Sequence, residues 1–115
     1  MEVFINYINQ AMEEANQAEA ELVQSDRKDE ANLQRIRANV YGICLKVYQV
    51  VSKTHEEAAL QKEYLNRLNA IAKNWEPAYE KAKAYNDVEK ILIEEIKMEV
   101  MQGVKERFLE LCHEK

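Results

Sequence analysis

Apolar residues recur at helical spacing along almost the whole chain. Between about Glu2 and Gln24, apolar side chains follow one another at intervals of four and three, which places them on one face of a helix. The members of this row are Phe4, Ile8, Ala11, Ala15, Ala18 and Leu22. Because alanine fills the middle of the row, this first predicted helix can approach a neighbour closely but needs a bulkier partner to bury a core.

The second predicted helix, from about Arg27 to Lys53, carries two apolar rows side by side. The first row consists of Leu33, Ile36, Val40, Ile43, Val47 and Val50, and the adjacent row of Tyr41, Cys44, Tyr48 and Val51. Polar residues and one glycine form only a narrow line: Arg35, Asn39, Gly42, Lys46, Gln49 and Lys53. A helix that is apolar over most of its circumference is typical of a central position or of an oligomer interface.

Two alternatives remain for the segment that joins these helices. Ser25 and Asp26 are good candidates to cap the second helix, because their side-chain oxygens can accept hydrogen bonds from its first amides. Leu22 and Leu33, however, are eleven residues apart, about three helical turns. A single helix of about 50 residues would therefore keep the row in phase and would require dimerisation. The polar residues and the opposite charges on either side favour a tight turn.

The third predicted helix starts at a capping-box pattern, with Thr54 capping the amide of Glu57 and Glu57 reaching back. It runs to about Asn74, with Leu60, Tyr64, Leu68, Ile71 and Trp75 on its buried side. Pro77 then removes a backbone donor and disfavours helical geometry at the preceding residue. Either the helix is kinked near Pro77, or it is broken there and a new helix begins.

Asn86 and Asp87 give the last cap signal, followed by a fourth helix from Val88 to about Cys112. Its core row consists of Ile93, Ile96, Val100, Val104, Phe108 and Leu111. Four long helices with short connections predict an all-α fold, an antiparallel up-down four-helix bundle that forms a single domain over residues 1–115. The third helix would be its kinked or broken member.

Composition agrees with this prediction. The 115 residues include only two glycines and one proline, so the chain has few of the residues that build hairpins and sheets. The longest apolar stretch is far shorter than the ~20 residues of a membrane span, and the first residues lack the basic region of a signal peptide. We therefore expect no membrane as a partner. Two cysteines are too few for a disulfide framework, which favours a cytoplasmic protein.

Charge disfavours nucleic acid as a partner. The net charge is −5, whereas nucleic-acid-binding domains are usually basic. The one basic cluster, formed by Arg27, Lys28, Arg35 and Arg37, has acidic residues close to it in the chain.

No metal, cofactor or catalytic site is expected. Glu110 and His113 form one Glu-x-x-His pair, but di-metal bundles need two such pairs, and His55 has Ser52 three residues before it. Cys44, Cys112, His55 and His113 could supply four zinc ligands, but no two of them have zinc-knuckle spacing. The acid pairs Glu13-Glu14, Glu56-Glu57 and Glu94-Glu95 are interpreted as solvated helix surface.

The aromatic residues leave one functional hypothesis open. Tyrosine and tryptophan are favoured where one end of the side chain is buried and the other is wet, as in interfaces, although bundle cores also contain them. The candidate interaction surface consists of Tyr41, Cys44, Tyr48, Val51, Trp75 and Tyr79. It predicts a non-enzymatic cytoplasmic protein that acts through protein–protein contact, with a second copy of itself as its expected partner in a homo-oligomer. The first alternative is a small regulator or chaperone-like adaptor that binds an amphipathic helix of a partner, and the weaker one is a metal- or ligand-binding bundle.

Overall fold

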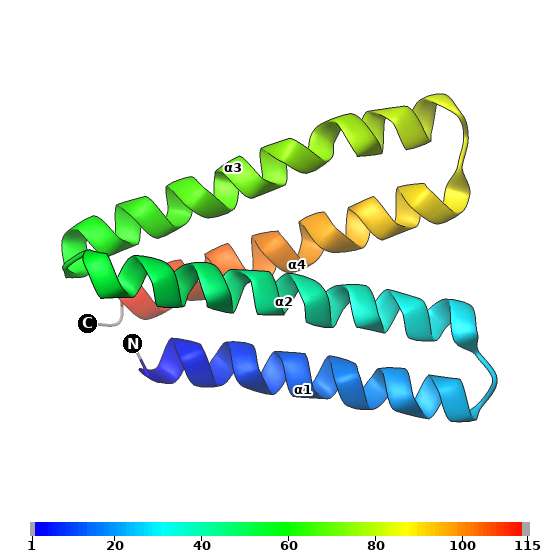
Figure 1. The fold of residues 1–115 in the computed structure, drawn as a ribbon, viewed down its shortest axis with the longest axis horizontal. Helices are drawn as coiled ribbons and strands as arrows, with labels where there is room; N and C mark the ends of the chain where they lie inside the picture. Colours follow the sequence, from blue (N-terminus) through cyan, green and yellow to red (C-terminus); the bar gives the residue numbers. More distant parts are fainter. Residues whose placement is uncertain (1, 114–115) are drawn as a thin grey trace.

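The computed structural model describes residues 2–113, and every regular element in that range is a helix. The helices are α1 (Glu2–Gln24), α2 (Lys28–Thr54), α3 (Glu57–Ala84) and α4 (Val88–His113). They run alternately up and down (Figure 1), which confirms the all-α, antiparallel four-helix bundle. Three of the four helices have bounds within a residue or so of the predicted ones, and α3 is ten residues longer at its C-terminal end.

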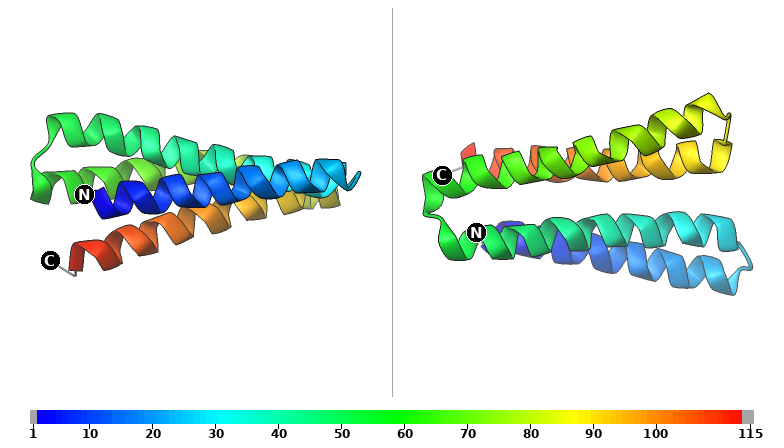
Figure 2. Two further views of the ribbon diagram at one scale, coloured as in Figure 1. Left: turned by 90° about the horizontal axis from the view of Figure 1, so that it is seen from below. Right: turned by 45° about the horizontal axis from the view of Figure 1, so that its top comes forward.

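The bundle consists of two hairpins that are close at one end and splayed at the other. The α1–α2 and α3–α4 hairpins approach each other where α2 leads into α3, and they diverge toward the two hairpin turns (Figures 1 and 2). We call these the closed end and the open end. Helices α2 and α4 each contact all three other helices, so they form the shared centre of the bundle.

The first hairpin turns through a residue with left-handed backbone geometry. Asp26 has φ of 59°, and its amide donates to the carbonyl of Val23 at 3.1 Å. The amide of Arg27 donates to the carbonyl of Leu22 at 2.8 Å. These two bonds are the pattern with which a glycine usually closes a helix. These bonds end α1 at this point, so α1 and α2 form a hairpin, and the alternative of a single long helix is wrong.

The second hairpin repeats this arrangement with Asn86, whose φ is 53°. Its amide donates to the carbonyl of Lys83 at 3.2 Å, and the amide of Asp87 donates to that of Ala82 at 3.0 Å. Asp87 then caps α4, because its carboxylate accepts a hydrogen bond from the amide of Lys90 at 3.2 Å. Of the predicted pair, Asp87 is therefore the cap, and Asn86 forms the turn before it.

Replacing Asp26 by glycine should raise the free energy of unfolding by about 0.5–1 kcal/mol. A left-handed conformation costs a residue with a Cβ about 1–2 kcal/mol, and the greater freedom of glycine in the unfolded chain offsets part of that gain. Chemical denaturation of Asp26→Gly measures the effect. Asp26→Ala is the control, because it keeps a Cβ in the left-handed region and should not be more stable than the natural protein.

The N-caps predicted for α2 and α3 are wrong. The N-cap of α2 is Arg27 rather than Ser25 or Asp26, and it makes no side-chain cap bond, because Asp26 is used in the turn itself. Thr54 does not cap α3 because it is still the last residue of α2, where its hydroxyl donates to the carbonyl of Val51 at 3.4 Å. Helix α3 begins at Glu57 instead.

Helix α3 continues through Pro77 to Ala84, so the predicted break near Asn74 is wrong. Proline cannot donate to the carbonyl four residues earlier, which here belongs to Lys73. Both Pro77 and Lys73 are exposed. Water can therefore donate a hydrogen bond to the Lys73 carbonyl, and the helix continues through Pro77 without a break. A kink at this position stays a prediction.

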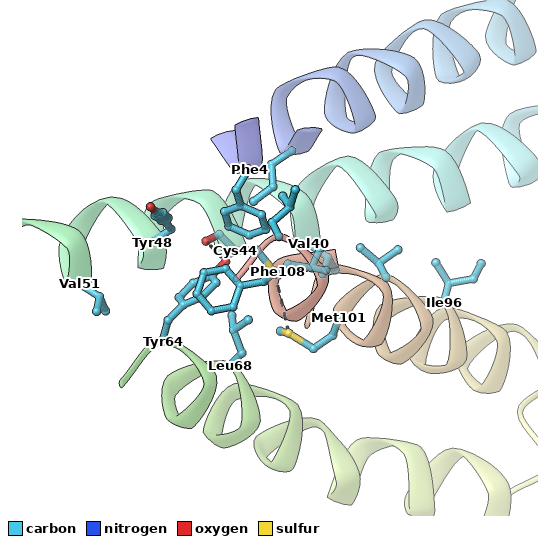
Figure 3. Packing of buried hydrophobic residues seen from close by; sticks show 14 residues of the cluster. Phe4, Val40, Cys44, Tyr48, Val51, Tyr64, Leu68, Ile96, Met101 and Phe108 are labelled. Carbon is cyan, nitrogen blue, oxygen red and sulfur yellow. Dashed lines mark hydrogen bonds between the residues drawn. The ribbon is translucent and has the colours of Figure 1, made fainter. Parts of the chain in front are cut away.

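The largest buried side chains gather at the closed end, where each helix contributes an aromatic ring to one cluster (Figure 3). Phe4, Tyr48, Tyr64 and Phe108 are all almost fully buried. The ring centroids of Tyr64 and Phe108 lie 4.8 Å apart, and those of Phe4 and Phe108 lie 5.1 Å apart, both edge to face. The Tyr64 hydroxyl donates to the carbonyl of Cys44 at 2.8 Å, which satisfies the only polar atom of its side chain.

Candidate functional site

Three of the six residues of the candidate interaction surface lie in the core instead. Cys44, Tyr48 and Val51 are almost completely buried, because this row of α2 faces the aromatic cluster at the closed end. Two members of the neighbouring apolar row are exposed: Ile43 at 40% and Val50 at 49%. The apolar surface of α2 is therefore on a different side from the one expected.

The other three residues, Tyr41, Trp75 and Tyr79, are half-buried. The Lys97 ammonium lies over the Trp75 ring, 4.7 Å from its centroid. The Tyr79 hydroxyl donates to a carboxylate oxygen of Glu95 at 3.3 Å. These contacts fasten α3 to α4, whereas Tyr41 belongs to α2. The six residues therefore do not form one continuous surface.

Glu94 is a functional candidate that sequence reasoning missed. It is only 8% exposed, so its interpretation as solvated surface is wrong. The Lys97 ammonium donates to both Glu94 carboxylate oxygens, at 3.0 and 3.1 Å. Glu94 and Lys97 continue the row of Met101, Val104 and Phe108 at intervals of three and four, which is the signal that could have found them. The core row of α4 thus becomes charged toward the open end.

A cleft of about 420 Å³ lies between the hairpins at the open end. The first turns of α2 and α4 line it with four apolar and four polar side chains. They are Leu33, Val88, Leu92 and Ile93, together with Asp29, Glu30, Asn32 and Glu89. We call this site the open-end cleft.

Apolar side chains of the open-end cleft are less covered than the core of the closed end. Val88 is 77% exposed and Leu92 is 43% exposed, while the aromatic cluster is almost inaccessible to water. Leu33 and Ile93 are partly buried. The sequence placed Leu33 and Ile93 in apolar rows. It could not show that the two hairpins diverge here and leave these side chains without full cover.

A second cleft, of about 670 Å³, lies at the closed end where α2, α3 and α4 meet. Its lining includes Tyr48, Leu60, Phe108 and Cys112. The other cysteine, Cys44, is buried with its sulfur 3.9 Å from that of Met101, and burial raises the pKa of its thiol to about 12, which disfavours the thiolate form.

Within residues 2–113, no three His, Cys, Asp or Glu side chains gather closely enough to hold a metal ion. None of the helices in this range combines the length and the apolar character needed to cross a membrane. Comparison of the chain with protein-family models, curated proteins and solved structures found no match. The residues and geometry of this chain alone therefore support the functional proposal.

Proposed function

We propose that this protein is a non-enzymatic cytoplasmic adaptor or regulator that acts through protein–protein contact, and that it holds a helix of a partner in the open-end cleft. The observation that carries this proposal is the exposure of Val88 and Leu92 inside a cleft between two diverging hairpins. Apolar side chains that gather in a concave site, rather than singly on a convex surface, are typical of binding sites.

A helix is the partner element that suits this cleft best. Its walls are the first turns of two helices, α2 and α4, which belong to different hairpins (Figure 1). An amphipathic helix presents anchor side chains at intervals of three and four residues, and such anchors enter grooves between helices. The cleft volume accommodates a few anchors, and in most interfaces a few buried residues supply most of the binding free energy.

Self-association is the second candidate function, and a separate observation favours it. Ile43 and Val50 are seven residues apart on α2, so they share one side of that helix, and both are substantially exposed. A second copy could cover them. This contact would use the outer side of the α1–α2 hairpin and would leave the open-end cleft accessible.

Site-specific photo-cross-linking in the native cells tests both candidates. A photoreactive residue replaces Leu92 in the open-end cleft, Val50 on the outer side of α2, or the exposed Gln102 as a matched control. We expect a discrete adduct with another protein from position 92 and none from position 102. An adduct of two copies of this chain from position 50 would support self-association. If position 92 gives no more adduct than position 102, the open-end cleft does not hold a partner.

A further inference from the structure

We propose that the helix held in the open-end cleft is a basic amphipathic helix, with apolar anchors along one side and lysine or arginine beside them. This inference rests on the proposed function and names the class of partner. It follows from the arrangement of charge around the apolar side chains of the cleft.

The charged side chains that line the open-end cleft are all acidic: Asp29, Glu30 and Glu89. Glu30 forms an ion pair with Arg27. Among the described residues, Asp29 and Glu89 take part in no recorded ion pair. Two carboxylates beside exposed apolar side chains are therefore available to a cationic partner, and a charge-assisted hydrogen bond to a carboxylate is stronger than a neutral one.

Neighbouring bases and helix dipoles do not cancel this acidic character. In the two hairpin turns and the helix starts that follow them, residues 26–30 and 86–90, acids outnumber bases by five to three. Lys90 pairs with Asp87 at 3.8 Å, and Arg27 pairs with Glu30. The positive ends of α2 and α4 meet the negative ends of α1 and α3 at the same end of the bundle, so the helix dipoles largely balance.

The net charge of the chain disfavours a second copy as the occupant. Two copies would each bring a charge of −5 to the contact, and juxtaposed like charges oppose association. A basic helix instead meets a complementary field, which accelerates its encounter with the cleft at low salt. The complementary occupant is thus a different protein with a cationic helix.

Fluorescence anisotropy with a labelled synthetic peptide tests this inference. The probe is an amphipathic peptide of leucine and lysine, about five helical turns long. Two matched peptides accompany it, one with glutamate in place of lysine and one with the leucine and lysine order scrambled. We expect the lysine peptide to bind at least about tenfold more tightly than either of them. Its binding should weaken between about 50 mM and about 300 mM salt.

Variants of the protein locate the binding site. Leu92→Asp should weaken binding by about tenfold or more, and Glu89→Lys should weaken it by about threefold to tenfold and reduce its salt dependence. The matched controls are Val50→Asp and Glu13→Lys, which make the same changes at exposed positions outside the cleft. Both should bind within about twofold of the natural protein. Circular dichroism and thermal unfolding establish that each variant is folded.

Three results would overturn the inference. Equal binding of the lysine and glutamate peptides, or of the scrambled peptide, shows that the cleft does not select a basic amphipathic helix. Loss of binding in the control variants as large as in Leu92→Asp shows that the peptide binds elsewhere. Light scattering that finds dimers which Leu92→Asp dissociates would make a second copy the occupant. If cross-linking from position 92 succeeds while the peptides fail, the proposed function stands and only the partner class is wrong.

Discussion

Phe108→Ala should lower the free energy of unfolding by about 3–5 kcal/mol, the usual effect of removing a buried aromatic ring. Small domains are stable by only about 5–15 kcal/mol in total, so the variant would be close to unfolding at room temperature. Phe108 has no exposed surface, and it comes from α4, which contacts all three other helices. Urea denaturation followed by circular dichroism measures the loss.

The size of this effect follows from the position of the Phe108 ring between three others. Its centroid lies 4.8 Å from that of Tyr64, 5.1 Å from that of Phe4 and 6.3 Å from that of Tyr48. Truncation therefore removes edge-to-face contacts with rings from α1, α2 and α3 at once, and the cavity cannot close without moving helices. The closed end would lose an aromatic cluster in which side chains of all four helices meet.

Two control variants separate this packing effect from other causes. Tyr64→Phe keeps the ring and loses only the hydrogen bond to the Cys44 carbonyl, so it should cost about 1 kcal/mol. Tyr85→Ala removes an aromatic side chain that is largely exposed and should have little effect. A loss for Phe108→Ala no larger than that for Tyr85→Ala would show that the aromatic cluster does not stabilise the fold.

The sequence predicted the four helices well because each carries a long apolar row with helical spacing. It did not predict which row of α2 faces the core, since two adjacent rows are equally apolar. Tertiary contacts decide that question: the row of Cys44, Tyr48 and Val51 meets the rings of α1, α3 and α4. The hydrogen bond from Tyr64 to the Cys44 carbonyl further fixes this side of α2 inward. Neither contact leaves a periodic signal in α2 itself.

The turns and the open-end cleft show a second limit of sequence reasoning. Asp and Asn were interpreted as N-caps, but Asp26 and Asn86 take left-handed geometry, which these two residues tolerate better than other residues with a Cβ. The cleft depends on how far the hairpins diverge, which no single helix encodes. The sequence placed Leu33 and Ile93 in apolar rows, and the ion pair between the buried Glu94 and the partly buried Lys97 is a local sign that the core becomes polar toward that end.

The aromatic cluster and the proposed binding site thus lie at opposite ends of the molecule. The aromatic cluster packs the closed end, so the hairpins can diverge at the open end without loss of the fold. In the open half, the buried residues of α1 and α2 include Ala15, Ala31 and Ala38. Their small side chains let α1 and α2 pack closely against each other, but they extend only a short way toward the α3–α4 hairpin. The open-end cleft could therefore accept a partner while the closed end keeps the helices together.

The protein should lose about 4 kcal/mol of stability between about pH 8 and about pH 11. Burial raises the pKa of the Cys44 thiol from 9.0 to about 12. Burial, with smaller effects of Cys44 and Tyr48, also raises the pKa of the Tyr64 hydroxyl well above its ordinary value of 10.0. Both groups are therefore neutral in the folded protein at a pH where they ionise in the unfolded chain.

The sign follows from proton binding. Above the unfolded-state pKa the folded protein binds more protons than the unfolded chain, so rising pH favours unfolding by about 1.4 kcal/mol per pH unit for each group. The contribution of Cys44 to the free energy of unfolding is complete below about pH 9 and is lost as the pH rises toward about 12. Tyr64 adds to this loss of stability above about pH 10. Urea denaturation at several pH values measures the decline. The Cys44→Ala variant, measured over the same pH range, should lose only about a third as much stability, because Tyr64 alone then contributes. If the variant loses as much stability as the natural protein, or if neither loses any, the buried thiol does not oppose ionisation in the folded state.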